Sequence, residues 1–335
     1  MKEFVHLHNH TEYSLLDGCT RVEKLVQEAK EQGARAVAIT DHGNMYGAIK
    51  FYKACEKHKI KPIVGCEFYV ADDLNAKNKE HNARYHLILL AKNLHGFHNL
   101  MKLSSVGYVD GFYDRPRIDY EVLKQYSSDL ICLSGCVAGG VSRRLNDMTL
   151  DDPYGEALAY AKKTQELFAE GDYYIEIQNH FLKEELHALP LLRKIAKEIG
   201  AKTVATNDLH YLYKSDAKAH DILLCIQTAK DYDDPNRFRF PNDEFYYKTY
   251  DEMLAVIGEE ESLDNTLEVA DKINLVIPFH QYTIPYYQPQ EGYAEDAGWC
   301  SKLHERRVSA YNGTTVSVKY DDCNPFYMAA GDFGD

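Results

Sequence analysis

The sequence predicts an α/β protein whose strands close into a barrel. Short apolar runs alternate with amphipathic helical patterns through about the first 210 residues, and this alternation is typical of parallel strands joined by crossover helices. Roughly seven strand–helix units fit this length, which favours a closed barrel over an open sheet. No GxGxxG motif follows the first apolar run, which excludes the simplest dinucleotide-binding fold.

Strands are expected at seven short apolar runs that are rich in β-branched or aromatic residues. In chain order they are 4–8, 36–40, 62–68, 85–91, 130–133, 173–177 and 202–206. Helices are expected where apolar residues recur at i, i+3, i+4 and i+7, as they do over 21–32 before Gly33. The other expected helices are 45–57, 97–108, 154–168, 184–199, 215–228 and 250–275.

These elements divide the chain into three parts. The barrel is expected over about 1–212, and a helical extension over about 213–286 completes the first domain. After Pro285 the chain loses its periodicity, so 287–335 is an unassigned tail in which only 303–307 carries a weak helical pattern.

Composition limits the classes of protein that the chain can belong to. The net charge of −14 argues against a protein that coats nucleic acid through bulk charge, although a local basic groove is compatible with it. No apolar run is long enough to span a membrane, and the N-terminus lacks the apolar region of a secretory signal. The 8 cysteines are scattered without a CxxC, which favours a reducing, cytoplasmic location over a disulfide framework.

Potential metal ligands cluster where the predicted strands end or, for one histidine, within a strand. In a parallel barrel these ends meet on one face, so the side chains are expected to converge there. A closed zinc site needs four ligands, and this larger set is enough for two or three divalent ions. Imidazole, carboxylate and one thiolate together suit Zn²⁺, Mn²⁺ or Fe²⁺. The set is His8, His10, Asp17, His42, Glu67, His86, Cys136, Asp208 and His210.

Each of these residues is weak evidence when taken alone. A His-x-His pair on a strand often arises by chance, and a lone cysteine such as Cys136 is usually a small buried hydrophobe. Glu67 is more informative, because an unpaired carboxylate at the end of an apolar strand is costly. Alternation along a strand puts His6, His8 and His10 on one face, so spacing alone does not identify the binding pair.

Longer motifs make the sequence recognisable. It resembles the polymerase-and-histidinol-phosphatase (PHP) domain and, more narrowly, the form of this domain at the N-terminus of bacterial DNA polymerase III alpha subunits. The resemblance covers about residues 3–286. The segments that carry it are LHNHT at 7–11, SLLDG at 14–18, TDHGNMYG at 40–47, GCE at 65–67, YHL at 85–87, LSGC at 133–136, ATNDLHY at 205–211, AHDILLCIQT at 219–228 and DDPNR at 233–237.

The resemblance implies a distorted seven-stranded β/α barrel with a trinuclear metal centre at the C-terminal rim. It implies two to three divalent ions, zinc, manganese or iron, with magnesium as a further candidate. It leaves His6 outside the ligand set. One ion would lie on His8, His10, Glu67 and Asp208, a second on the bridging Glu67 with His86 and Cys136, and a third on Asp17, His42 and His210.

The implied reaction is metal-assisted phosphoester hydrolysis, in this family a 3′→5′ exonuclease proofreading activity. It would depend most directly on His10, Glu67 and Asp208. The implied partners are a single-stranded DNA 3′ end, the remaining domains of the polymerase alpha subunit and the replisome; no polymerase activity is expected of this stretch. Two readings compete: a small-molecule phosphatase of the histidinol-phosphate type, and a non-catalytic scaffold for the polymerase and its proofreading partner.

Basic and aromatic side chains near the rim are candidates for guiding a nucleic-acid strand. Arg84 and Arg117 are the predicted substrate-binding residues. The alternative for all the arginines is pairing with surface carboxylates. The wider set comprises Arg115, Arg237 and Arg239, with Tyr108, Phe112 and Tyr113 available for base stacking.

Overall fold

The structure is a computed structural model that describes residues 2–78, 83–279, 305–309 and 315–319. It forms two compact units, Met1–Ile277 and Pro278–Asp335. In the second unit the described residues form an antiparallel pair, β8 (Glu305–Ser309) and β9 (Thr315–Lys319). The helical pattern expected over 303–307 is therefore wrong at 305–307, while 303–304 and the expected domain end at 286 lie outside the described residues.

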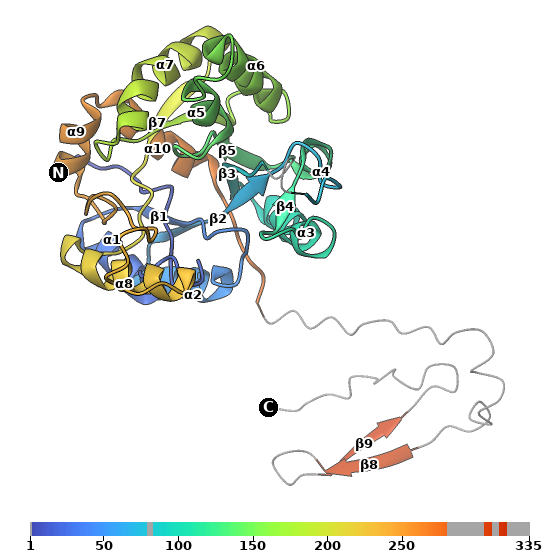
Figure 1. The fold of residues 1–335 in the computed structure, drawn as a ribbon. Helices are drawn as coiled ribbons and strands as arrows, with labels where there is room; N and C mark the ends of the chain where they lie inside the picture. The colour runs from blue at the N-terminus through green and yellow to red at the C-terminus, as the bar shows by residue number, and fades with distance from the viewer. Residues whose placement is uncertain (1, 79–82, 280–304, 310–314, 320–335) are drawn as a thin grey trace. The chain divides into compact units, whose positions relative to one another are not determined.

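A seven-stranded sheet organises the first unit (Figure 1). Its order is β1-β2-β3-β5-β6-β7, with the two-residue β4 paired to β2. Six of these strands lie where the sequence predicts them, and β4 is an addition. The strands are β1 (Ala36–Ile39), β2 (Lys61–Val70), β3 (Tyr85–Ala91), β4 (Arg117–Ile118), β5 (Leu130–Leu133), β6 (Tyr173–Ile177) and β7 (Lys202–Ala205).

The N-terminal run completes the barrel without forming a regular strand. On one side the backbone oxygen of His6 accepts a hydrogen bond from Ala38. On the other side His10 N donates to Leu209 O at 2.7 Å, and Leu209 N donates to His8 O at 3.2 Å. The prediction of a strand over 4–8 is therefore wrong, because these hydrogen bonds are too sparse to form a regular β-ladder. The segment nevertheless lies between β1 and the chain that follows β7.

One strand runs against the others, which corrects the expectation of an all-parallel barrel. β3 is antiparallel to both β2 and β5, whereas the pairs β1–β2, β5–β6 and β6–β7 are parallel. No helix lies in the described part of the connection between β2 and β3, and a parallel pair needs such a crossover. The reversal brings the first residues of β3 to the rim where its neighbours end, and His86 is paired there with Tyr69.

Helices cover the outside of the sheet, with α1 and α2 on one side and α5 to α7 on another (Figure 1). α1, for example, buries an apolar stripe of Val22, Leu25, Val26 and Ala29. The helices are α1 (Val22–Glu31), α2 (Ala48–His58), α3 (Leu94–Val109), α4 (Tyr120–Tyr126), α5 (Gly140–Leu145), α6 (Pro153–Gln165) and α7 (Lys183–Ile199).

The extension consists of η1 (Lys214–Asp216), α8 (Ala217–Thr228), α9 (Tyr250–Ile257) and α10 (Glu261–Lys272). The single helix predicted over 250–275 is wrong, because Gly258 ends α9 in a left-handed conformation with φ of 81°. α10 packs on β7, where Asn265 donates to Thr203 O at 2.8 Å. None of the described helices is long and apolar enough to cross a membrane.

Candidate metal centre

The structure brings all the predicted metal ligands into one contact network at the barrel rim. His8, His10 and Glu67 form its floor and are at most 1% exposed. An open cleft of ~1120 Å³ lies over this floor. The predicted ligands that line the cleft are Asp17, His42, His86, Asp208 and His210.

Glu67 is the centre of the network. It lies in β2, and an isolated parallel bridge to His42 extends the β1–β2 pairing to this point. Its Oε1 lies 2.8 Å from His86 Nδ1 and 3.4 Å from His8 Nε2. Its Oε2 lies 2.6 Å from His42 Nδ1 and 3.3 Å from His10 Nε2. The two oxygens of one carboxylate therefore reach imidazoles carried by different segments, as a bridging ligand must.

Asp208 closes the floor from the segment after β7. Its Oδ1 lies 3.2 Å from the Nε2 atoms of both His8 and His10, and 3.6 Å from His210 Nδ1. The residue has a φ of 41°, which is uncommon for a residue other than glycine. The hydrogen bond from Leu209 N to His8 O holds this turn beside the N-terminal run.

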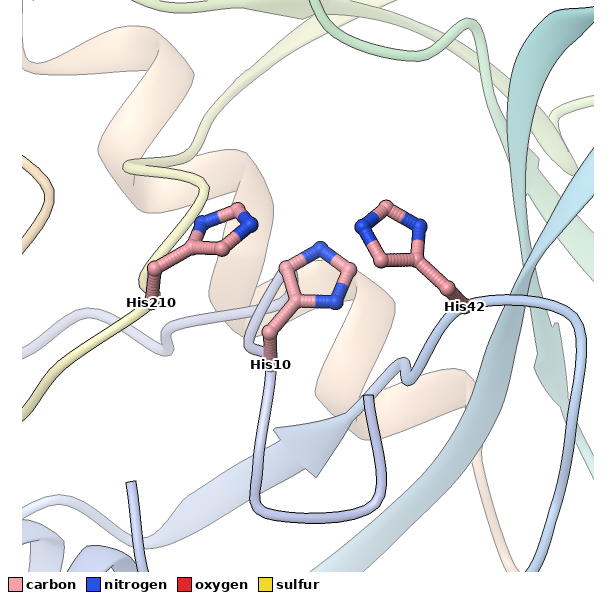
Figure 2. Close-up of side chains that lie close together, drawn as sticks. All are labelled: His10, His42 and His210. Atoms are coloured by element: carbon pink, nitrogen blue, oxygen red, sulfur yellow. The ribbon is translucent and has the colours of Figure 1, made fainter. Parts of the chain in front are cut away.

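Three histidine rings lie side by side at the mouth of the barrel, with His10 between His42 and His210 (Figure 2). The ring centroid of His10 is 4.1 Å from that of His42 and 4.4 Å from that of His210. Asp17 joins the two outer rings: its Oδ2 is 2.9 Å from His42 Nε2 and 3.7 Å from His210 Nε2. Asp17, His42 and His210 form a second group of potential ligands beside His10 of the floor.

Cys136 enters the network through a tight turn after β5. Gly135 has a φ of 88°, and a Cβ built on it would lie 2.4 Å from His86 O, so the turn needs glycine. This close approach places Cys136 Sγ 3.6 Å from His86 Nδ1 and 4.0 Å from Glu67 Oε1.

Opposite charges in this buried site keep one another ionised. Burial raises the pKa of the Glu67 carboxyl, but the imidazoles of His86, His42 and His8 outweigh burial and hold that pKa well below its usual range. For His8, burial lowers the pKa, and the carboxylates led by Asp208 raise it well above the usual value. The carboxylates are therefore charged, which is the state in which they bind a metal.

The donor set fits a divalent cation. Two atoms that bind one zinc ion at tetrahedral angles lie about 3.4 Å apart. The Nε2 atoms of His8 and His10 are 3.1 Å apart, and each is 3.2–3.4 Å from oxygens of Asp208 and Glu67. Asp208 Oδ1 and Glu67 Oε2 are buried, yet neither accepts a well-aligned hydrogen bond from the described residues. The imidazole nitrogens and carboxylate oxygens thus surround a shared centre, where a bound cation would replace the Nε2 proton of His8.

His6 lies outside this network, although its spacing from His8 left it a candidate. Its Nε2 pairs with Lys248 O at 2.9 Å, and its ring packs between Phe4 and Tyr247, with centroids 4.6 Å and 4.1 Å away. The alternation argument fails because the N-terminal run is not a regular strand.

Two supporting residues were missed by the sequence reasoning. Glu176 lies in β6, and its Oε1 contacts His8 Nδ1 at 2.7 Å. Ser14 Oγ lies 2.8 Å from His10 Nδ1 and donates to Asp41 Oδ1 at 2.8 Å. Glu176 stands within an apolar strand, the same signal that singled out Glu67. Ser14 belongs to the segment SLLDG at 14–18, but its residue type gives no sign of a contact with His10.

The predicted arginines divide into two groups. Arg84, Arg115 and Arg239 line the cleft. Arg117 is placed otherwise than predicted: it is buried, and its guanidinium donates to the backbone oxygens of Gly111, Ala76 and Leu74, so it fastens loops together. Arg237 is also buried and is paired with Asp221. Cleft-lining arginines that the sequence reasoning did not name are Arg143 and Arg144. The predicted stacking residues Tyr108, Phe112 and Tyr113 are not among the residues that line the cleft.

Comparison with known proteins gives three findings. The family model described as PHP domain matches residues 6–180. DNA polymerase III subunit alpha of Treponema pallidum is 45% identical over 315 residues, which are 92% of this chain and 26% of that protein. The Thermus aquaticus subunit alpha is 41% identical over 88% of this chain and 25% of its own length. The chain therefore spans about a quarter of the length of these relatives.

Among solved structures, the fold is similar to a two-domain protein from Bacteroides vulgatus that contains a predicted PHP-like metal-dependent phosphoesterase. The TM-score is 0.40 at 16% identity, with 79% of this chain and 69% of that chain covered.

Proposed function

Since this chain belongs to the PHP domain family, we propose that it hydrolyses phosphoesters with bound divalent ions, and that its substrate is the 3′ end of single-stranded DNA. The observation that carries the proposal is the carboxylate of Glu67, whose two oxygens contact four imidazoles from separate segments at the base of an open cleft. This arrangement has more ligands than a structural zinc site needs.

In this proposal the chain binds two to three divalent ions. The candidates are zinc, manganese and iron, with magnesium as a further candidate. Glu67 would be shared by the first two sites, since its carboxylate contacts His8, His10 and His86. Three groups of side chains with donor atoms within 4.8 Å of one another support several neighbouring sites. The first ion would lie on His8, His10, Glu67 and Asp208, the second on Glu67, His86 and Cys136, and the third on Asp17, His42 and His210.

When bound, such ions supply Lewis-acid stabilisation of the phosphoryl oxygens and lower the pKa of an attacking water. The chain itself fixes the donors. Glu176 holds the Nδ1 side of His8 and leaves Nε2 directed to the floor. Arg84 and Arg115 at the cleft wall provide positive charge for the phosphodiester of the substrate. No side-chain nucleophile is required.

The relatives that the chain matches are DNA polymerase III alpha subunits. The same proposal includes a proofreading role in replication. The partners would be the remaining polymerase domains and the replisome, and the location would be the cytoplasm. The chain corresponds to about a quarter of the length of those subunits.

The test is hydrolysis by the purified chain after loading with Zn²⁺ or Mn²⁺. A 5′-labelled single-stranded oligonucleotide should be shortened stepwise from its 3′ end, and an oligonucleotide with phosphorothioate linkages at that end should resist. Faster turnover of histidinol phosphate than of DNA would replace the exonuclease with a small-molecule phosphatase. A metal-loaded protein that hydrolyses neither substrate would leave a scaffold role and overturn the proposal.

A further inference from the structure

We propose that Phe238 and Arg239 are the nucleotide-recognition element of this cleft. Phe238 stacks on the base of the terminal nucleotide, and Arg239 pairs with a phosphate of the same strand. The proposal rests on phosphoester hydrolysis at the metal centre and adds the two residues that recognise the unpaired nucleobase and the phosphate of the strand.

The first observation is the position of these residues beside the ligands. The segment Phe238–Pro241 lines the cleft together with His210 and Asp17. The ring of Phe240 packs edge-on against His210, with centroids 4.8 Å apart, and Phe238 packs edge-on against Phe240 at 6.0 Å. Phe238 is therefore one ring further from His210 than Phe240 is, on the same wall of the cleft.

The second observation is the exposure of Phe238. Phe240 is half-buried among His210, His220 and Phe245, whereas 56% of Phe238 is exposed. A single exposed phenylalanine is ordinary on a protein surface. Here, however, the exposed ring stands inside the cleft that holds the candidate metal ligands.

The third observation is that the backbone beneath Phe238 is held in place. The guanidinium of Arg237 forms a two-pronged ion pair with Asp221 of α8, at 2.5 and 2.6 Å, and donates to Tyr232 O at 2.8 Å. Arg237 is only 6% exposed. A loop fixed in this way loses little conformational freedom when a ligand binds, so the exposed ring is a preorganised stacking surface.

Arg239 supplies the matching charge. It is exposed and lines the cleft, and its guanidinium donates one long hydrogen bond of 3.5 Å to Asp234 O. Among the described residues, no carboxylate oxygen lies within 4.0 Å of a guanidinium nitrogen of Arg239, the distance of an ion pair. The guanidinium is thus available to an anion that enters the cleft, whereas the neighbouring Arg237 is already paired. An aromatic ring beside a cation is the combination that binds single-stranded nucleic acid without a sequence preference.

The test uses the metal-loaded chain and an oligothymidylate that ends in 2-aminopurine behind a phosphorothioate linkage, which resists cleavage. Binding to the wild-type chain should change the 2-aminopurine fluorescence through stacking. Phe238→Ala should weaken binding about tenfold and abolish that change, and Phe238→Tyr should restore both. Arg239→Gln should lower the slope of log Kd against log salt by about 0.7. Phe181→Ala is the matched control, because Phe181 is also 56% exposed but does not line the cleft.

Hydrolysis separates this proposal from the one on which it rests. Phe238→Ala should raise KM for a cleavable oligonucleotide while leaving kcat and the turnover of a base-free ester such as glycerol 3-phosphate near wild type. If the wild-type chain hydrolyses no phosphoester, the proposed function fails. If it cleaves DNA but shows no fluorescence change on binding, or if Phe238→Ala and Arg239→Gln bind DNA like wild type, the recognition element is wrong.

Discussion

Glu176 Oε1 contacts His8 Nδ1 at 2.7 Å, while Nε2 of the same ring faces Glu67 and Asp208. A carboxylate on one ring nitrogen holds a proton there, so the proton that a bound metal would displace is the one on the other nitrogen. Gln178 and Thr206 donate hydrogen bonds to the same oxygen of Glu176 and fix its orientation. The position of His8 is thus determined by residues that are not themselves among the predicted metal ligands.

Glu176→Gln should weaken metal binding about 10- to 100-fold. The amide oxygen still accepts a hydrogen bond from His8, but the negative charge that makes the imidazole a better ligand is lost. Competition with a chromogenic chelator for Zn²⁺ measures the change. Glu156→Gln, an exposed substitution in α6, should bind as wild type does. Equal affinities for the two variants would remove the role assigned to Glu176.

Asp208→Asn should reduce hydrolysis about 100-fold or more while the fold persists, because the substitution keeps the shape of the side chain and removes a charge shared by His8 and His10. His10→Ala should have the same effect. The rates are measured on the labelled oligonucleotide, with circular dichroism to check folding. His6→Gln is the control from the same stretch, since His6 lies outside the network, and its rate should stay within about twofold of wild type. A fully active Asp208→Asn would place the chemistry elsewhere.

Arg117→Met should destabilise the fold rather than weaken substrate binding. It removes the donors to three backbone oxygens in a fully buried place, at a cost of about 2–4 kcal/mol. Urea unfolding measures this cost. Arg84→Gln, at the cleft wall, should do the opposite and raise KM for DNA with little change in stability. A stable Arg117→Met with a raised KM would restore the substrate role predicted from the sequence.

Chelation should lower the temperature of unfolding by about 8–16 °C. Ions that bind only the folded state stabilise it by about 4 kcal/mol when their concentration is 1,000 times the Kd, and for a domain of this size each kcal/mol corresponds to about 2–4 °C. Calorimetry before and after EDTA treatment, followed by Zn²⁺ addition, checks the effect. If neither EDTA treatment nor Zn²⁺ addition changed the unfolding temperature, the result would contradict a bound metal.

Much of the fold was predictable because it depends on local pattern. β3 lies where its apolar run predicts it, and α7 (Lys183–Ile199) differs from the prediction by one residue. The reversed direction of β3 was not predictable, since strand direction depends on the connection rather than on the strand. The residues after β2 carried no signal that the crossover helix is missing.

The candidate site was predictable to the extent that its residues follow strand ends. Glu67 and Cys136 were identified in this way, and the structure places them in contact with His86. Arg117 could not be judged from sequence, because a buried arginine that holds loop carbonyls has the same local pattern as one at a cleft wall. The stacking surface at Phe238 depends on the ion pair between Asp221 and Arg237, which are 16 positions apart. No periodicity in the sequence reveals this pairing.

The most direct test of the central claim is elemental analysis of the chain. After purification without added metal, and again after loading with Zn²⁺ or Mn²⁺ and removal of free ions, the metal content is measured per chain. The account predicts two to three ions per loaded chain, and fewer when Glu67, the shared ligand, is replaced by Gln. Less than one ion per chain after loading would contradict it.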